Sequence, residues 1–140
     1  MDLSIVIVNW NSVQYLGPCL DTVLQHTHGI RCEIIVIDSG SFDGSAELLR
    51  QRYPSVRFIQ SRDNLGFAGA NNLACRSASG EHLLFLNPDT QVSAGSVQLM
   101  LDHLRRHPGA GAVGVRLLNS DGSLQSSCIQ PFPTILNQLL

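Results

Sequence analysis

The sequence contains no lysine: all nine basic residues among its 140 are arginines. This absence excludes three kinds of chemistry from the chain, namely a P-loop lysine, the strand lysine of a protein kinase and a lysine Schiff base. Charged residues make up only 14% of the chain and the formal net charge is −2. Because nucleic acids and anionic membranes are bound by strongly basic surfaces, we expect neither a nucleic-acid partner nor a polybasic membrane footprint.

Long apolar runs and paired cysteines are also missing. No apolar segment approaches the roughly 20 residues of a membrane-spanning helix. The four cysteines, Cys19, Cys32, Cys75 and Cys128, lie far apart and form no Cys-x-x-Cys pair, which argues against zinc and against a disulfide framework. The first residues run directly into an apolar strand with no signal peptide before it. These features predict four buried thiols in a reducing cytoplasm.

Short apolar runs alternate with segments of helical periodicity, in a chain long enough for one domain with a sizeable core. The predicted strands are 3–8, 32–37, 56–60 and 82–86, with a further strand centred on 112–115. The predicted helices are 13–26, about 45–52, 67–77 and 93–107. This alternation predicts an α/β fold, with a mostly parallel sheet and right-handed crossovers.

Helix ends can be predicted from their capping residues. Asn11 or Ser12 is suited to cap the first helix, and Asp43 or Ser45 the second, because short polar side chains accept from free N–H groups there. Gly80 is suited to end the third helix at its C′ position.

The stretch from Leu83 to Thr90 is the most informative one. Its apolar run predicts a central strand buried on both faces, and Pro88 ends that strand because it has no N–H. Asp89 is thereby placed on a stiff turn at the carboxyl end of the strand, where open α/β sheets bind ligands. Asp89 is therefore the first candidate for a chemical centre, and the alternative is an ordinary turn aspartate.

Residues 9–12 and 38–45 form two further polar loops at predicted strand ends, so three such loops fall on one carboxyl edge. The first loop lacks the Gly-x-Gly-x-x-Gly fingerprint, which argues against a dehydrogenase. Asp38 can accept from a nucleobase N–H, and Trp10 offers a flat face for stacking, although a helix cap and core packing are alternatives. Asp89 offers a hard oxygen ligand for Mg²⁺ or Mn²⁺. The loops therefore predict a nucleoside-diphosphate site with a divalent cation.

Four motifs in the same order resemble family 2 glycosyltransferases, and especially the bacterial rhamnosyltransferase-type branch. They are Ile-Val-Ile-Val-Asn-Trp-Asn-Ser at 5–12, Val-Ile-Asp-Ser-Gly-Ser-Phe-Asp-Gly-Ser at 36–45, Asn-Leu-Gly-Phe-Ala-Gly-Ala-Asn-Asn at 64–72 and Leu-Asn-Pro-Asp-Thr at 86–90. The resemblance extends from Leu3 into the 111–124 region. It implies a GT-A fold with a Rossmann-like nucleotide-sugar half, residues 1–140 being a single domain truncated on the acceptor side.

The resemblance also implies roles for individual residues. The implied nucleotide-sugar-binding residues are Val8, Asn9, Trp10, Asp38, Gly40, Asn64, Gly66, Asn87, Pro88 and Asp89. Of these, Asp38 would bind the base, and residues 87–89 stand at the Asp-x-Asp element of the family. Asp89 is the one carboxylate there, so it would be the metal ligand, and its hold on Mg²⁺ or Mn²⁺ would depend on the bound diphosphate.

The function implied by the resemblance is metal-assisted, inverting transfer of a sugar in bacterial surface polysaccharide synthesis. The donor would be dTDP-rhamnose or a UDP-sugar, and the acceptor a glycan or a lipid-linked glycan, in the cytoplasm or at the inner face of the cell membrane. We expect the general base beyond Leu140, so that this chain alone would bind nucleotide but transfer sugar poorly or not at all. The apolar tail, 135–140, would support a homodimer if exposed. The alternative is a non-catalytic α/β nucleotide-binding or interaction module.

Overall fold

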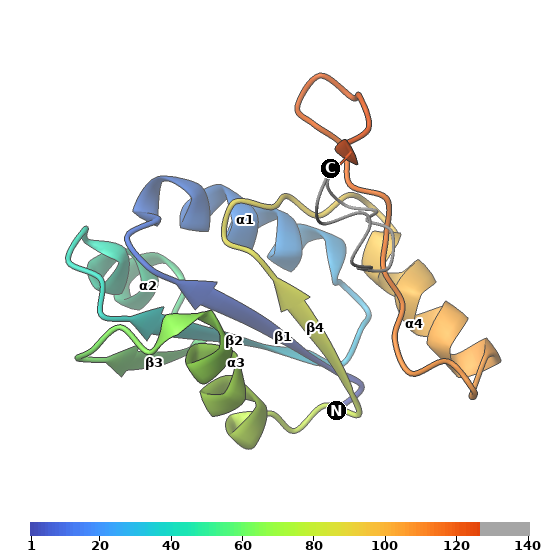
Figure 1. Cartoon of the computed structure of the whole chain (residues 1–140), viewed down its shortest axis with the longest axis horizontal. Helices are drawn as coiled ribbons and strands as arrows, with labels where there is room; N and C mark the ends of the chain where they lie inside the picture. Colours follow the sequence, from blue (N-terminus) through green and yellow to red (C-terminus); the bar gives the residue numbers. More distant parts are fainter. Residues whose placement is uncertain (127–140) are drawn as a thin grey trace, which may run out of the picture. The chain divides into compact units, whose positions relative to one another are not determined.

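The computed structural model describes residues 1–126. Its elements are β1 (Leu3–Asn9), α1 (Val13–His26), β2 (Cys32–Ser39), α2 (Ser45–Arg52), β3 (Arg57–Ser61), α3 (Gly66–Ser77), β4 (His82–Leu86) and α4 (Ser96–Arg106) (Figure 1). These helices and four of the predicted strands lie where the sequence predicts them, within a few residues. The chain divides into two compact units, 1–101 and 102–140, and the sheet belongs to the first. Among the described residues, no helix has the length and apolar character needed to cross a membrane.

The sheet has the strand order β3-β2-β1-β4, and every neighbouring pair is parallel. The register places Asn9 at the end of β1 opposite Asp38 of β2, and Ile7 opposite Leu86 of β4. The predicted α/β fold with a parallel sheet is therefore confirmed. The polar loops that follow β1, β2 and β4 consequently leave the sheet at the same edge, which we call the site edge.

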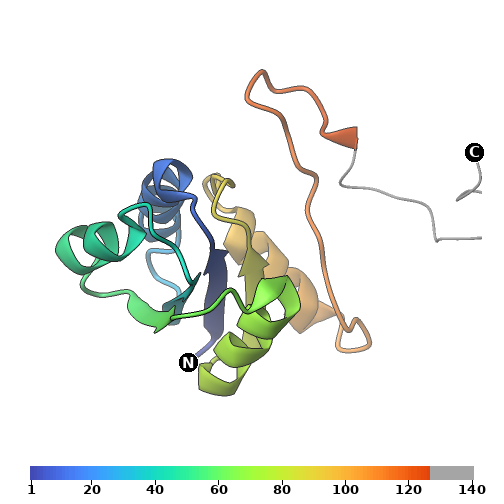
Figure 2. The ribbon, with the colours of Figure 1, turned by 60° about the vertical axis from the view of Figure 1, so that its left-hand side comes forward.

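Helices cover both faces of the sheet because strand side chains alternate in direction. On one face, Ile5 and Ile7 of β1 share a core with Leu16 and Leu20 of α1 and Leu49 of α2. On the other face, the larger strand residues pack against small residues of α3: Val6, Ile35 and Ile37 meet Ala70 and Ala74. Figures 1 and 2 show α3 across the sheet from α1 and α2.

One prediction about β4 is wrong. It is the edge strand of the described sheet, and only one of its faces is covered. Leu84 and Leu86 pack against the core, whereas Leu83 and Phe85 on the other face are 42% and 50% exposed. The reason is that α3 packs over β1 and β2. An apolar run alone does not distinguish a central strand from an edge strand with an apolar exposed face.

Three smaller predictions also fail or fall outside the described residues. No regular strand forms around 112–115, and the described residues there contain only an isolated bridge between Leu118 and Leu124. Cys19 is buried, but Cys32 and Cys75 are only half-buried, and all three are free thiols. Cys128 and the apolar tail at 135–140, with the homodimer predicted from it, lie outside the described residues.

Gly80 does not end α3, as the sequence suggested. The helix ends at Ser77, and Ala78 takes the cap position with an extended backbone. Gly80 instead lies against β1, where a Cβ atom would overlap Ser4 N and come within 2.5 Å of the carbonyl carbon of Leu3. Glycine is required here because the α3–β4 connection approaches the β1 backbone closely.

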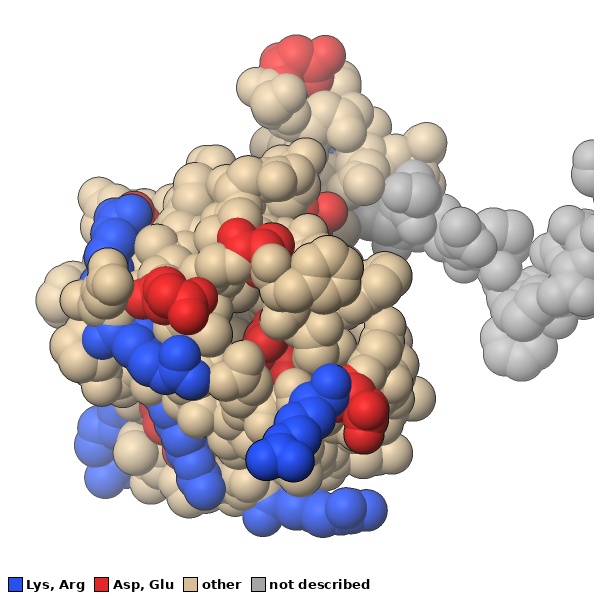
Figure 3. All heavy atoms as spheres, turned by 90° about the vertical axis from the view of Figure 1, so that its left-hand side faces the viewer, with Lys and Arg blue, Asp and Glu red and all other residues tan. Residues whose placement is uncertain are grey.

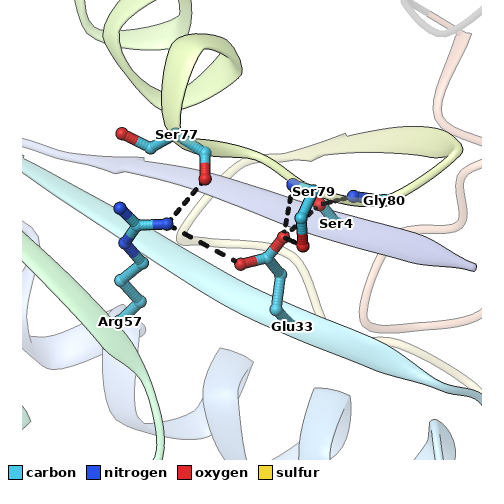
Figure 4. A network of polar contacts seen from close by, with 6 residues as sticks. All are labelled: Ser4, Glu33, Arg57, Ser77, Ser79 and Gly80. Atoms are coloured by element: carbon cyan, nitrogen blue, oxygen red, sulfur yellow. Dashed lines mark hydrogen bonds and ion pairs between the residues drawn. The ribbon is translucent and has the colours of Figure 1, made fainter. Parts of the chain in front are cut away.

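A network of hydrogen bonds holds the α3–β4 connection against the amino-terminal ends of the strands, opposite the site edge (Figure 4). Gly80 N–H donates to Ser4 Oγ at 2.8 Å, and Glu33 Oε1 accepts from Ser4 Oγ and from the N–H and Oγ of Ser79, each at 2.7 Å. Arg57 donates to the carbonyl of Ser77 at 2.6 Å. Burial raises the pKa of Glu33, but the hydrogen bonds from Ser79 and Ser4 outweigh it and hold that pKa below its ordinary value.

Candidate functional site

The site edge is built around a buried pair, Asn9 and Asp38, at the ends of β1 and β2. Both residues are fully buried, and Asn9 Nδ2 donates to Asp38 Oδ1 at 2.9 Å. The remaining oxygens, Asn9 Oδ1 and Asp38 Oδ2, have no hydrogen-bond partner among the described residues. An unpartnered buried acceptor costs about 1–3 kcal/mol, and such atoms are rare in native proteins. Asp38 therefore does not cap a helix; it presents an oxygen that lacks a donor.

The loops after β1 and β2 are joined by hydrogen bonds through Ser41 and Asn11. Ser41 Oγ accepts from Asn9 Nδ2 at 3.2 Å and from Asn11 N–H at 2.9 Å. In return, Asn11 Oδ1 accepts from Phe42 N–H at 3.1 Å. Asn11 has a positive φ of 49°, which asparagine tolerates better than most residues. Motif reasoning missed Ser41, although its place in a serine-rich loop opposite an asparagine-rich loop was a usable signal.

Asp43 caps two helices at once. Its Oδ2 accepts from Val13 N–H, the first residue of α1, at 2.8 Å. Its Oδ1 accepts from the N–H and Oγ of Ser45, the first residue of α2, at 3.1 and 2.6 Å. Burial acts to raise the pKa of Asp43, yet the hydrogen bonds from Ser45 and Val13 prevail and lower it. Ser12 occupies the N-cap position of α1, as predicted, but the predicted side-chain cap is wrong. The Ser12 hydroxyl donates to the carbonyl of Trp10, and Asn11 Oδ1 accepts from Phe42 N–H.

Two aromatic side chains in the loops after Asn9 and Asp38 are exposed. Trp10 is 55% exposed and Phe42 88% exposed, so the alternative in which Trp10 is a core residue is wrong. Val8 is half-buried and packs on the α3 side of the sheet. An open hollow lies over the ends of β2 and β3, lined by Gly40, Ser41, Phe42, Gln60, Ser61 and Arg62. Figure 3 shows the face toward which the strands point, with acidic side chains near its middle and arginines toward one side and below.

The loop after β3 closes onto the end of β2 at Gly40. Gly40 has a φ of 77°, and a Cβ there would lie 3.0 Å from the carbonyl carbon of Asp63 and 3.1 Å from Asn64 N. Ser39 Oγ accepts from Leu65 N–H at 2.7 Å, while Asn64 Oδ1 accepts from Gly66 N–H at 2.8 Å. The structure thus brings Gly40, Asn64 and Gly66 to one corner of the site edge.

Asp89 lies on the turn Asn87–Thr90, which we call the Asp89 turn. Thr90 N–H donates to the carbonyl of Asn87 at 3.1 Å, and both Asn87 and Asp89 are exposed. Burial, and after it the charge of Asp89, raises the pKa of the nearby Cys19 thiol to about 12. The described residues contain no group of three or more His, Cys, Asp or Glu placed to hold a metal. One carboxylate fits a cation that takes its other ligands from phosphate oxygens and water.

Sequence comparison assigns these loops to a known family. The model for glycosyl transferase family 2 matches residues 4–134. The N-acetylglucosaminyl-diphospho-decaprenol L-rhamnosyltransferase of Mycobacterium tuberculosis is 34% identical over 69% of this chain and 35% of its own length. The chondroitin synthase of Escherichia coli is 31% identical over 89% of this chain and 19% of its own.

Two solved structures share the fold. Staphylococcus aureus TarS 1–349 in complex with UDP-GlcNAc matches with a TM-score of 0.70 at 20% identity, over 77% of this chain and 32% of that one. The mannosyltransferase PcManGT from Pyrobaculum calidifontis, in complex with GDP-Man and Mn²⁺, matches with a TM-score of 0.70 at 20% identity, over 84% and 35%. The fold is therefore that of GT-A glycosyltransferases over part of their length. The chain spans about a third or less of each relative, and it belongs to glycosyl transferase family 2.

Proposed function

We propose that this chain forms the donor-binding part of a glycosyltransferase that uses a nucleoside-diphosphate sugar and a divalent cation. The observation that carries the proposal is the unpartnered, buried Oδ2 of Asp38 at the site edge, inside a motif of the family. The names of the relatives support it, since they include a rhamnosyltransferase and structures with UDP-GlcNAc and with GDP-Man and Mn²⁺. We further propose inverting transfer onto a glycan or lipid-linked acceptor in bacterial surface polysaccharide synthesis, with dTDP-rhamnose or a UDP-sugar as donor.

Asp38 is assigned to the base of the nucleotide. A ring N–H of the base would supply the donor that Oδ2 lacks, and Asn9 holds the other oxygen, Oδ1, in place. Because Asp38 is fully buried, neighbouring groups have to shift before the base reaches it. Trp10 and Val8 are assigned to the walls of the nucleoside site, since Trp10 offers an exposed aromatic face on which a base stacks.

The diphosphate is assigned to the other part of the site edge. Asp89, with Asn87 and Pro88 in the same turn, would hold Mg²⁺ or Mn²⁺, which acts as a Lewis acid on the leaving diphosphate when bound. Asn64, Gly66 and Gly40 are assigned to the loop beside the nucleoside and diphosphate. The general base stays a prediction of the resemblance, and no residue of the described chain is assigned to it.

Calorimetric titration of the 140-residue chain with UDP, dTDP and GDP, in Mn²⁺ and in EDTA, tests the proposal. Asp38→Asn should weaken binding about tenfold or more in both conditions, because it replaces one acceptor oxygen of a buried hydrogen-bonding pair with an amide group that can only donate. Asp89→Asn should remove only the gain that Mn²⁺ provides. Asp63→Asn is the matched control, since Asp63 is exposed and its carboxylate has no hydrogen-bond partner among the described residues.

Two results would contradict the proposal. If no nucleoside diphosphate binds the wild-type chain, with or without Mn²⁺, the donor-binding assignment fails. If nucleotides bind equally well to Asp38→Asn, Asp89→Asn and the control, the site lies elsewhere. The second result favours the alternative, a non-catalytic nucleotide-binding or interaction module.

A further inference from the structure

Helix α1 holds both ends of the segment that carries Asp89. At the entry, Cys19 Sγ lies 3.7 Å from the carbonyl oxygen of Asn87 and donates to it. At the exit, Thr22 Oγ1 accepts from Val92 N–H at 3.0 Å. Cys19 and Thr22 are three residues apart, so they stand on the same face of the helix. Figure 1 shows the chain after β4 running across α1.

The contact at Asn87 acts on the hydrogen bond that defines the turn. The carbonyl of Asn87 accepts from Thr90 N–H at 3.1 Å, which closes the Asp89 turn, and it accepts from Cys19 as well. A carbonyl oxygen has two lone pairs and can serve both donors. The fully buried thiol of Cys19 therefore fixes the carbonyl from which the exposed turn is built.

Thr22 is prepared for its contact by the helix itself. Its hydroxyl donates to the carbonyl of Cys19 at 2.9 Å, which sets the direction of the hydroxyl and leaves its lone pairs for Val92 N–H. Val92 is 8% exposed and belongs to the core, so its buried N–H needs an acceptor. Thr22 supplies that acceptor.

The same helix begins at the base side of the site edge. Its first N–H, on Val13, donates to Asp43 at 2.8 Å, and the chain before it carries Asn9, the last residue of β1, and Trp10. Helix α1 joins the two sides of the site edge as one element, and Pro18 is the one residue in it without an N–H for the hydrogen-bond ladder. We propose that Cys19 and Thr22 are positioning residues: they fix the Asp89 turn on α1, so that the carboxylate meets the cation and the diphosphate of a nucleotide whose base is held at the other end. This inference rests on the proposed function and deepens it.

Substitutions of Thr22 test the inference with two readouts. Thr22→Val removes the acceptor at nearly constant volume, Thr22→Ser keeps it, and Thr27→Val is the matched control. Thr27 lies just after α1, and its hydroxyl donates to the carbonyl of Val23 at 2.8 Å. The first readout is amide hydrogen exchange at Val92 in the metal-free chain. The second is the ratio of nucleoside-diphosphate affinity in Mn²⁺ to that in EDTA, measured with the tightest-binding diphosphate of the wild-type chain.

Thr22→Val should speed exchange at Val92 and lower the Mn²⁺/EDTA affinity ratio about tenfold, the usual loss when a group supporting a metal ligand is removed. Affinity in EDTA should stay unchanged, because the base side is untouched. Thr22→Ser should restore the ratio, and Thr27→Val should leave it at the wild-type value. Cys19→Ala should lower the ratio by about threefold, since a thiol is a weak donor, with Cys75→Ala as its control.

The outcomes separate the two proposals. If Thr22→Val and Cys19→Ala both keep the Mn²⁺/EDTA affinity ratio of the wild-type chain, the positioning role is overturned. The proposed function is not affected by that result. A wild-type chain that binds diphosphates equally in Mn²⁺ and EDTA overturns the metal role of Asp89 and the inference with it. If circular dichroism shows that Thr22→Val does not fold, Cys19→Ala and Thr22→Ser decide the question.

Discussion

Replacement of Asp43 should loosen two helix starts with one substitution. In the native chain, its carboxylate accepts from Val13 N–H at the start of α1 and from the N–H and Oγ of Ser45 at the start of α2. Asp43→Ala leaves both helices without a side-chain cap, because neither Ser12 nor Gly44 makes one. Asp43→Asn keeps one oxygen and can satisfy only one of the two helix starts.

The expected magnitude follows from the two caps. Loss of one cap costs about 1 kcal/mol, with a range of about 0.5–2, so Asp43→Ala should lower the free energy of unfolding by about 2 kcal/mol. Asp43→Asn should lower it by about 1 kcal/mol. Urea denaturation, followed by circular dichroism at pH 7, measures both values. Asp63→Ala is the control, because it removes an exposed carboxylate of the same size without a hydrogen-bond partner among the described residues.

The destabilisation caused by Asp43→Asn should also depend on pH. The hydrogen bonds lower the pKa of Asp43 in the folded state, so its stabilisation is complete above the ordinary Asp pKa, about 3.9. It is lost as the pH falls through the lower, folded-state pKa. The stability gap between wild type and Asp43→Asn should therefore shrink in strong acid. If Asp43→Ala and Asp63→Ala unfold at the same urea concentration at pH 7, the double cap contributes nothing and the reasoning is refuted.

Two further substitutions probe the opposite edge of the sheet. Gly80→Ala should lower the free energy of unfolding by about 1–3 kcal/mol through overpacking against the β1 backbone at Ser4. Gly109→Ala, where a Cβ meets nothing within 4 Å, should change it by less than about 0.5 kcal/mol, and equal effects of the two would contradict the close approach. Glu33→Gln should destabilise the chain at pH 7 but not below the lowered pKa of Glu33, where the wild-type carboxyl is protonated too. Urea denaturation at pH 7 and at a pH below that pKa measures the loss in the free energy of unfolding. An equal loss at both pH values would disprove a role for the Glu33 charge.

Strand and helix positions could be predicted because periodicity and punctuation agree along most of the chain. The run from Leu3 to Val8 is β-branched and apolar, and β1 forms there. What the pattern could not supply is the neighbour of each strand. The exposure of Leu83 and Phe85 follows from the place of β4 at the sheet edge and of α3 over β1 and β2, and neither is encoded in the local run. The strand predicted around 112–115 failed for the same reason: β propensity depends on a partner.

The site was predictable at the level of loops and less so at the level of contacts. Parallel strands guarantee that the loops after β1, β2 and β4 share an edge, so Asn9, Asp38 and Asp89 could be grouped from the sequence. The side-chain cap of α1 was mispredicted because it was sought next to its own helix, whereas Asp43, predicted for α2, does bond the start of α2. Asp43 reaches α1 from a loop 30 residues away, and such contacts depend on tertiary structure rather than on sequence distance.

Asp38 and Asp89, both at the site edge, differ in burial, the property that decides their chemistry. Asp38 is fully buried, with one oxygen held by Asn9 and one unpartnered, and a hydrated cation would have to lose most of its water to reach it. Removing that water is costly for Mg²⁺, which usually keeps several water ligands, whereas a planar N–H donor of a base brings no such cost. Asp89 is exposed on a turn held by α1, where a bound cation would keep its water ligands and still reach a phosphate. Burial alone therefore favours Asp38 for the base and Asp89 for the metal, and exchanging the two assignments would place the charge of the cation where water cannot follow it.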